Sequence, residues 1–143
     1  MKNHKEDSFH LGVKALILNP DNKILLLERN HPSKGIYWDI PGGRLLKGES
    51  QMDTLNRELK EEIGLDHIYK VHFLMMTLTD IRISAQEGEF GLIFSIFILN
   101  VSDSFQPILS DEHINFEWCT LLEASERLKF QYPNEFIKKL LSL

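Results

Sequence analysis

Five acidic side chains lie within the fourteen residues from Glu49 to Glu62, and glycines bracket the stretch on both sides. Glu58, Glu61 and Glu62 are spaced i, i+3 and i+4, so on a helix they would share one face. Like charges at those spacings repel by roughly a few tenths of a kcal/mol per pair. Carboxylate oxygens are hard ligands that suit Mg²⁺ or Mn²⁺. The spacing therefore indicates a divalent-metal site, in which a bound cation offsets the repulsion.

A solvent-exposed acidic face without any chemical role is the alternative, because runs of charge are often no more than that. Arg57 and Lys60 would neutralise such a face only in part, since both point away from its centre. The charges alone leave both interpretations open.

The sequence also predicts a loop that leads into this helix. The Pro-Gly-Gly run at 41–43 is typical of a tight turn where the backbone approaches a ligand closely. Ser50 is a good N-cap residue with Asp53 three positions later, and Gly64 can adopt the left-handed conformation that ends a helix. We therefore expect a helix over residues 51–63, preceded by a glycine-rich turn.

Other elements must position this helix. Its apolar residues recur at positions 52, 55, 59 and 63, which predicts a face that packs against a sheet. Strands are expected in two hairpins, at 11–18 with 23–29 and at 70–81 with 90–101 around a polar loop at 84–89, and in one further segment at 115–120. Helices are expected at 121–130 and 133–143. Strands interspersed with helices imply a mixed sheet covered on its faces.

Composition sets outer limits on the function. The chain has 143 residues, 43% of them apolar and 26% charged, as expected for one ordinary globular domain over residues 1–143. The net charge of −5 argues against binding to nucleic acid polymers or to anionic membranes, which need a basic surface. The longest apolar stretch, at 92–99, is too short to span a membrane, and the polar start carries no signal core, so a cytoplasmic location is expected.

The glycines and charges together form a spaced motif. From Gly43 the chain reads Gly, five residues, Glu49, seven residues, and then RELKEEIGL at 57–65. This resembles the Nudix box, G-x5-E-x7-R-E-U-x-E-E-x-G-U with U aliphatic, at every constrained position. The box covers 23 of the 143 residues. Looser similarity extends to YWDIPGG at 37–43 and to SDEHINFEW at 110–118.

The resemblance to the Nudix family implies an α/β fold: an α/β/α sandwich around a mixed sheet, with a loop–helix–loop catalytic motif. It implies a hydrolase acting on a nucleoside diphosphate linked to another moiety, with Mg²⁺ or Mn²⁺ as cofactor. The partner is then a small-molecule nucleotide diphosphate. A proline or tyrosine past the box hints at particular substrates in some subfamilies, and residues 80–83 contain neither. The substrate therefore stays open.

The resemblance also implies metal ligands, carried over position by position. They are Gly43, Glu49, Glu58, Glu61 and Glu62. Glu61 and Glu62 match the central metal-binding pair, and Glu58 matches a carboxylate that binds metal or activates water. Glu49 matches an accessory carboxylate near the metals, and Gly43 a residue whose backbone carbonyl can reach a metal.

Further residues complete the expected site. Arg57 matches the box residue that orients the carboxylates through a salt bridge. Glu112 aligns with a loop carboxylate that in some family members binds metal or acts as the general base, and His113 follows it directly. Arg29 and Arg44 are candidates for holding terminal phosphates, because Arg is suited to bidentate contact. An ordinary surface role fits these two arginines equally well.

Two other classes of function stay open beside the hydrolase. A Nudix-like module that binds a nucleotide metabolite without turnover would usually lack some box glutamates, and all of them are present here. An allylic diphosphate isomerase would need a reactive cysteine, and the single cysteine, Cys119, lies on a predicted strand. A homodimer formed through an exposed hairpin or helix is compatible with the sequence.

Overall fold

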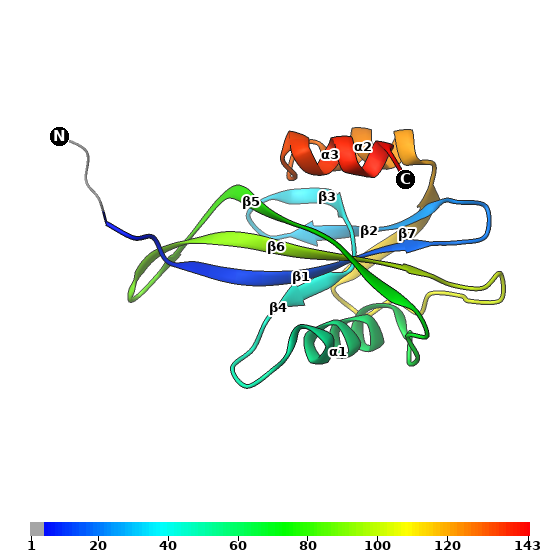
Figure 1. The fold of residues 1–143 in the computed structure, drawn as a ribbon, viewed down its shortest axis with the longest axis horizontal. Coiled ribbons are helices and arrows are strands. Elements are labelled where there is room, and N and C mark those ends of the chain that lie inside the picture. Colours follow the sequence, from blue (N-terminus) through cyan, green and yellow to red (C-terminus); the bar gives the residue numbers. More distant parts are fainter. Residues whose placement is uncertain (1–4) are drawn as a thin grey trace.

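The computed structural model describes residues 5–143, and a single seven-stranded sheet organises them. In chain order the elements are β1 (Phe9–Leu18), β2 (Ile24–His31), β3 (Gly35–Asp39), β4 (Gly42–Arg44), α1 (Gln51–Ile63), β5 (Val71–Ala85), β6 (Gly88–Asn100), β7 (His113–Cys119), α2 (Leu121–Leu128) and α3 (Asn134–Leu141). Helix α1 covers one face of the sheet, and α2 and α3 cover the other (Figure 1). The fold is therefore α/β with a central sheet between helices, as predicted.

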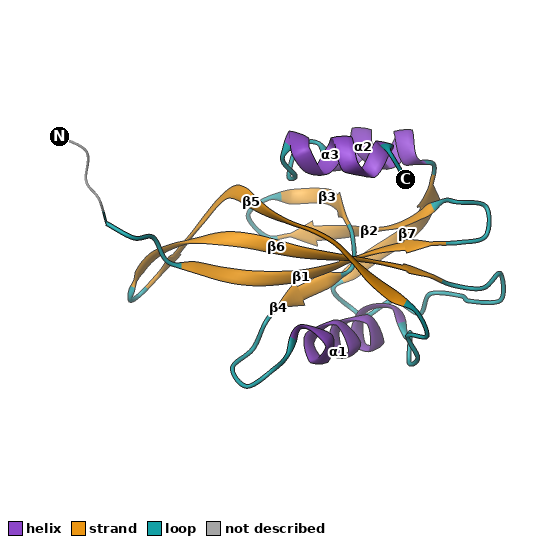
Figure 2. Ribbon diagram, viewed as in Figure 1, coloured by secondary structure: helices purple, strands orange, loops and turns teal. Residues whose placement is uncertain are grey.

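The sheet is mixed because one central pair of strands is parallel. The strand order is β3-β2-β1-β6-β5, with β4 also on β1 and β7 also on β2. Strands β1 and β6 run parallel from the Phe9↔Gly91 pair to the Leu18↔Asn100 pair, whereas the other pairs are antiparallel. A parallel pair needs a long crossover connection, and the chain supplies it with α1 and β5 (Figure 2).

Both predicted hairpins are confirmed, with one change of boundary. Between β1 and β2, the Asn19 side-chain oxygen accepts hydrogen bonds from the N–H groups of Asp21 and Lys23 at 3.0 and 2.9 Å. Between β5 and β6, strands continue to Ala85 and resume at Gly88. The polar loop predicted at 84–89 is wrong in length, because Gly88 has φ +126° and lets the chain reverse in a tight turn.

The tight turn predicted at 41–43 is wrong in part. Gly42 and Gly43 belong to the short strand β4, which pairs antiparallel with β1. A Cβ atom on Gly42 would lie 2.2 Å from the carbonyl oxygen of Val13, so only glycine lets β4 approach β1 this closely. The sequence pattern did not predict β4, nor the neighbouring strand β3.

The core has two layers, one on each face of the sheet. Side chains alternate along β1, so Val13, Ala15 and Ile17 face α1 while Leu16 and Leu18 face α2 and α3. Of the four residues that the periodicity predicted to face the sheet, Leu55, Leu59 and Ile63 are fully buried and Met52 is partly buried. On the other face, Leu128 of α2 and Phe136 and Leu140 of α3 are fully buried. The sheet is thus held rigidly between two apolar layers.

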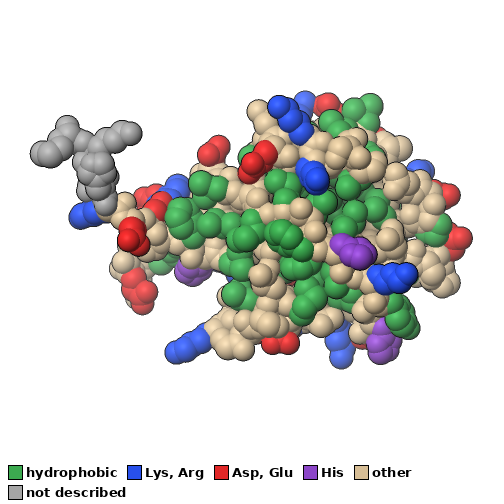
Figure 3. Space-filling model, in the orientation of Figure 1, with side chains coloured by type: hydrophobic (Ala, Val, Ile, Leu, Met, Phe, Trp, Pro, Cys, Tyr) green, Lys and Arg blue, Asp and Glu red, His purple; other side chains and the backbone are tan. Residues whose placement is uncertain are grey.

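Strand β5 forms one edge of the sheet and leaves apolar side chains exposed. Phe73, Met76 and Leu78 are about half exposed, at 56%, 50% and 56%. Hydrophobic side chains gather over β5 and β6 on the face seen in Figure 3. Within residues 5–143, no helix is long and apolar enough to cross a membrane.

Candidate active site

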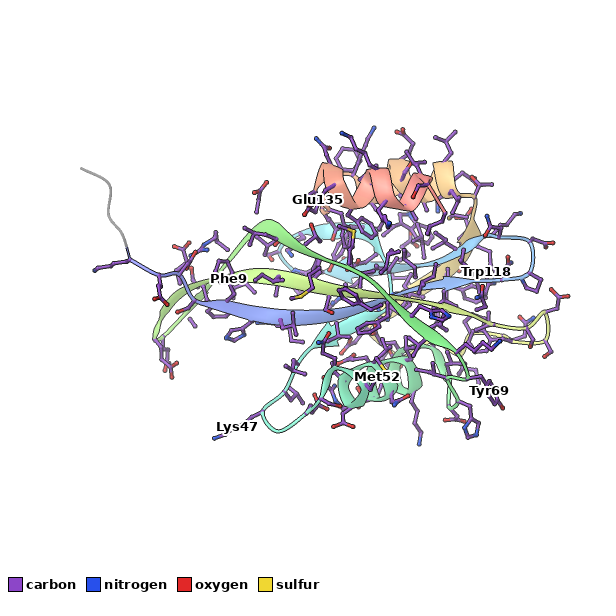
Figure 4. The ribbon with its side chains drawn as sticks, viewed as in Figure 1. Phe9, Lys47, Met52, Tyr69, Trp118 and Glu135 are labelled. Atoms are coloured by element: carbon purple, nitrogen blue, oxygen red, sulfur yellow. The ribbon has the colours of Figure 1, made fainter. Side chains whose placement is uncertain are left out.

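Helix α1 carries the acidic residues, and its ends are fixed by the predicted caps. Ser50 Oγ accepts the N–H of Asp53 at 3.1 Å, and the Asp53 carboxylate accepts the N–H of Ser50 at 3.0 Å. Gly64 ends the helix in the left-handed region with φ +72°. Met52 lies on the helix surface that faces the sheet, whereas Lys47 lies on the loop that precedes the helix, away from the sheet (Figure 4). The loop–helix–loop unit is therefore built as predicted.

The three glutamates of the helix differ sharply in exposure. The Glu62 side chain is 8% exposed, Glu58 is 17% exposed and Glu61 is 64% exposed. Glu62 lies at the end of the helix next to Ile63, where α1 packs on the sheet. The exposure of the carboxylates on the acidic face therefore rises from buried Glu62 through Glu58 to solvent-exposed Glu61.

Glu62 is the most unusual group of the site. Its Oε1 accepts the backbone N–H of Gly42 at 2.9 Å, and its Oε2 lies 3.3 Å from Nε2 of His113. Burial raises the pKa of Glu62 well above its usual range, and the Glu58 carboxylate adds to the effect, while Lys14 and the Gly42 N–H act against it. A buried carboxylate beside a second one is the arrangement that a bound cation would relieve.

His113 is also shifted toward its neutral form. Burial lowers the pKa of its imidazole, and the charge of Arg29 acts in the same direction. The contact between His113 and Glu62 is therefore a close approach of two groups whose pKa shifts both favour the uncharged form, not a strong ion pair.

Arg57 joins the carboxylates of the box. Its Nε and Nη2 donate to the two oxygens of Glu49 at 2.8 and 2.9 Å, and its Nη1 donates to Glu58 at 2.6 Å. Glu61 lies 4.0 Å from the same Nη1. This guanidinium is the largest cause that lowers the pKa of Glu49 to about 2. The helix pattern predicted that Arg57 would neutralise the acidic face only in part. In the structure Arg57 contacts Glu58 on the helix and also Glu49 in the preceding loop.

Gly43 lies directly against Glu58. A Cβ atom on Gly43 would be 2.2 Å from Oε1 of Glu58, so the absence of a side chain lets the strand β4 pack on the carboxylate. The Arg44 carbonyl in turn accepts a hydrogen bond from Arg57 Nη2 at 3.3 Å. Strand β4 and helix α1 are therefore in contact through Gly43 with Glu58 and through Arg44 with Arg57.

The donor set suits a hard divalent cation in its chemistry. All candidate side-chain ligands are carboxylate oxygens, and the Glu62 carboxyl contacts the Gly42 backbone N–H and the His113 imidazole. In the part of the chain that the structure describes, no three His, Cys, Asp or Glu side chains are grouped closely enough to hold one ion as they stand. Two of the carboxylates, Glu49 and Glu58, are turned toward Arg57 instead.

The remaining predicted residues lie at different distances from this centre. Glu112 is exposed, whereas its neighbour His113 is the residue that contacts Glu62. Arg29 is half-buried on β2, where it pairs with His113 of β7. Arg44 is exposed, and the contact with Arg57 comes from its backbone. The roles predicted for Glu112, Arg29 and Arg44 stay predictions.

Two features were missed by sequence reasoning. One is a cavity of about 750 Å³ on the α2–α3 side, lined among others by Tyr37 and Trp38 of β3, Ile81 of β5 and the segment 129–133. The other is Lys14, whose ammonium group binds Asp39 at 3.1 Å. The signal for Lys14 was present, because it is a charge in the middle of an apolar strand. The cavity has no local signal.

Cys119 does not support isomerase chemistry. The thiol is buried in the core between β7 and α2, and burial raises its pKa to about 11. A nucleophilic or acid cysteine is exposed to its substrate and has a lower pKa. The structure therefore gives the isomerase alternative no support.

The fold and the site together define an α/β domain with an acidic loop–helix against a sheet. The chain matches the model of the NUDIX domain over residues 8–140. It is 32% identical over 124 residues to the CTP pyrophosphohydrolase of Escherichia coli K12, covering 86% of this chain and 82% of that protein. The chain therefore belongs to the Nudix hydrolase family, whose members generally use divalent metals.

Two further comparisons show how much of this chain and of each similar protein the similarity covers. The chain is 32% identical over 125 residues to an octanoyltransferase of Myxococcus xanthus, which covers 84% of this chain and only 32% of that protein. The solved structure of the MutT protein from Methanosarcina mazei Go1 superposes with a TM-score of 0.66 at 26% identity, covering 96% of this chain and 94% of that one. The Nudix similarity thus extends over the whole fold.

Proposed function

We propose that the chain is a divalent-metal-dependent pyrophosphohydrolase that cleaves a diphosphate bond in a nucleoside triphosphate or another nucleoside diphosphate-linked substrate. The observation that carries the proposal is the complete acidic box, in which buried Glu62 contacts Gly42 while Arg57 holds Glu49 and Glu58. The similarity to a CTP pyrophosphohydrolase over most of both chains supports the same reaction class.

The chemistry explains why such a site is needed. The anionic oxygens of a pyrophosphate repel an attacking nucleophile, so catalysis depends on neutralising charge and on positioning water in line. A bound divalent cation would polarise the phosphorus and lower the pKa of bound water. The protein's part is to present carboxylates at fixed positions, to exclude water around Glu62 and to accept a proton from the attacking water.

The residues divide this work according to their environments. Glu58, Glu61 and Glu62 would hold the metal, Mg²⁺ or Mn²⁺, with Glu49 and the Gly43 carbonyl as accessory ligands. Arg57 bridges Glu49 and Glu58 and fixes their orientation through its charge-assisted hydrogen bonds. Glu112, which is exposed on the loop before β7, is the candidate general base that the family pattern indicates.

The nucleoside part of the substrate would occupy the cavity of about 750 Å³ on the α2–α3 side of the sheet. The cavity is lined in part by β3, which is followed in the chain by β4 and the acidic box. Its aromatic side chains, among them Tyr37 and Trp38, offer flat apolar surfaces to a base. Arg29 and Arg44 would then contact the phosphates. The net charge of −5 favours a small nucleotide over a nucleic acid polymer.

The organisation of the protein follows the same proposal. Because the NUDIX match extends over residues 8–140, we treat the chain as a single Nudix domain. The apolar edge strand β5, with Phe73 and Leu78 exposed, is the surface through which a homodimer would form.

The deciding experiment is release of phosphate or pyrophosphate from a panel of nucleoside triphosphates, ADP-ribose, nucleotide sugars and dinucleoside polyphosphates. Each is assayed with Mg²⁺, with Mn²⁺ and with a chelator, for the wild type, Glu62→Gln and the exposed control Glu87→Gln. Metal-dependent turnover of one substrate class that is lost only in Glu62→Gln supports the proposal. No turnover across the panel, together with calorimetric binding of a nucleotide, would instead identify a binding module.

A further inference from the structure

Lys14 is a charged residue inside an apolar strand. It is 8% exposed on β1, between Val13 and Ala15, which are both fully buried. An ammonium group taken out of water is costly unless it is paired and hydrogen-bonded. Lys14 Nζ donates to Oδ2 of Asp39 at 3.1 Å and to the carbonyl oxygen of Ile40 at 3.1 Å. Asp39 is the last residue of β3, and Ile40 begins the connection from β3 to β4.

Asp39 is also held by the segment between α2 and α3, on the same face of the sheet as the Lys14 side chain. The hydroxyl of Tyr132, in the segment between α2 and α3, donates to Oδ1 of Asp39 at 2.5 Å. The side-chain amide of the adjacent Gln131 donates to the carbonyl oxygen of Trp38 at 2.8 Å. Trp38, Gln131 and Tyr132 also line the 750 Å³ cavity. The wall of the cavity and the end of β3 are therefore fixed to each other.

The segment that follows Asp39, residues 40–42, contacts the acidic helix. Lys14 pairs with Gly42 in the register of β1 with β4, and the N–H of Ala15 donates to the Pro41 carbonyl at 2.9 Å. A Cβ atom on Gly42 would lie 2.7 Å from Cδ of Lys14, so the lysine stem packs on the glycine backbone. The N–H of Gly42 then donates to Glu62. Residues 40–42 thus lie between the lysine and the buried glutamate.

We propose that Lys14 is a positioning residue of the active site, which fixes the segment at residues 40–42 through Asp39 and the Ile40 carbonyl so that the Gly42 N–H is directed at Glu62. The contacts of Tyr132 and Gln131 extend this arrangement to the cavity wall. The proposal rests on the proposed function for its catalytic consequence, but the placement of Gly42 is a property of the metal-free chain.

A purely structural ion pair would behave differently. Removing Lys14 would then lower the melting temperature and leave the folded protein with its turnover and its Gly42 hydrogen bond intact. A positioning role requires both to change in molecules that are still folded. The two roles are therefore separated by measurements on the folded state.

The test uses Lys14→Met, which keeps the aliphatic stem and removes the ammonium group, and Lys14→Arg, which restores a cation. The double variant Lys14→Met with Asp39→Asn removes both charges, so that no unpaired carboxylate is left buried. Lys23→Met, an exposed lysine just before β2, is the matched control. Amide hydrogen exchange of Gly42 is followed by NMR in metal-free protein, and kcat and KM are measured with the best substrate of the wild type.

Loss of the lysine contacts should speed exchange of the Gly42 amide by about tenfold or more, since the hydrogen bonds from Lys14 to Asp39 and to the Ile40 carbonyl are lost. The amide of Leu16 in the same strand should keep its protection. In both methionine variants kcat should fall by about tenfold with KM nearly unchanged, and Lys14→Arg should recover part of the loss. Lys23→Met should match the wild type.

Wild-type Gly42 protection and kcat in the methionine variants would overturn the proposal, as would a loss confined to the melting temperature. A wild type that hydrolyses nothing in the panel would overturn the proposed function alone. The rate of amide hydrogen exchange at Gly42 would in that case still decide whether Lys14 positions residues 40–42.

Discussion

Glu62 accepts a hydrogen bond from the backbone N–H of Gly42 at 2.9 Å, across 20 residues of sequence. This contact ties the last turn of α1 to the strand that precedes the helix. Burial at this position raises the pKa of Glu62 and so disfavours its charged form. The carboxyl is thus held in place in an environment where a divalent cation would stabilise its charge.

Replacing this carboxylate should abolish turnover without unfolding the protein. Glu62→Gln keeps the size of the side chain and an oxygen to accept the Gly42 N–H, but removes the negative charge. We expect kcat to fall on the order of a hundredfold or more, as when one group aimed at developing charge is removed. Turnover is measured beside circular dichroism and the control Glu87→Gln. Near-normal turnover in Glu62→Gln would exclude the assigned role.

The same substitution should change how stability depends on pH in metal-free protein. Burial raises the folded-state pKa of Glu62 from 4.5 to about 8. Below pH 4.5 both states hold the proton, and as the pH rises toward 8 the unfolded state loses it first, so stability falls over this window. Relative to the wild type, Glu62→Gln should therefore gain melting temperature between pH 5 and pH 8 in chelator. A difference in melting temperature that stays constant with pH would contradict the shift.

Arg57 should not tolerate the conservative replacement by lysine. Its fork contacts both oxygens of Glu49 and one oxygen of Glu58, and a single ammonium group cannot reproduce that geometry. We expect Arg57→Lys to lose about 10–100-fold in kcat/KM. Arg82→Lys is the matched control, because Arg82 also contacts two carboxylates, Asp7 and Glu89, and lies in the β5–β6 hairpin. Equal behaviour of the two variants would count against a specific role for Arg57.

A methyl group at Gly43 should be enough to disturb the site. In Gly43→Ala the new Cβ would meet Oε1 of Glu58 at 2.2 Å, so the carboxylate or β4 must move. A displacement of about 1 Å can cost on the order of a hundredfold in rate, and we expect a loss of at least tenfold. Gly48→Ala, in the loop between β4 and α1, meets nothing within 4 Å and should mainly lower stability through its φ of +85°. Titration calorimetry with Mn²⁺ should show weaker binding in Gly43→Ala only.

The local elements of the site were predictable because their signals are short-range. Ser50, Asp53 and Gly64 define the ends of α1 within a few residues, and the periodic leucines define its buried face. The spacing of the acidic residues likewise indicated a shared helix face. Strand β4 was not predicted, because its glycines read locally as a turn, and only pairing with β1 makes them a strand.

The sequence by itself determined which chemical groups the site contains and which family it resembles. These groups are three glutamates on one helix, an arginine that contacts them and a glycine-rich segment before the helix. Only the tertiary structure decided that Glu62 is buried while Glu61 is exposed, that His113 rather than Glu112 contacts Glu62, and that Lys14 reaches the turn before β4. Caps and periodicity act within a few residues of sequence. Burial and hydrogen bonding between distant residues depend on strand order and register, which no single segment encodes.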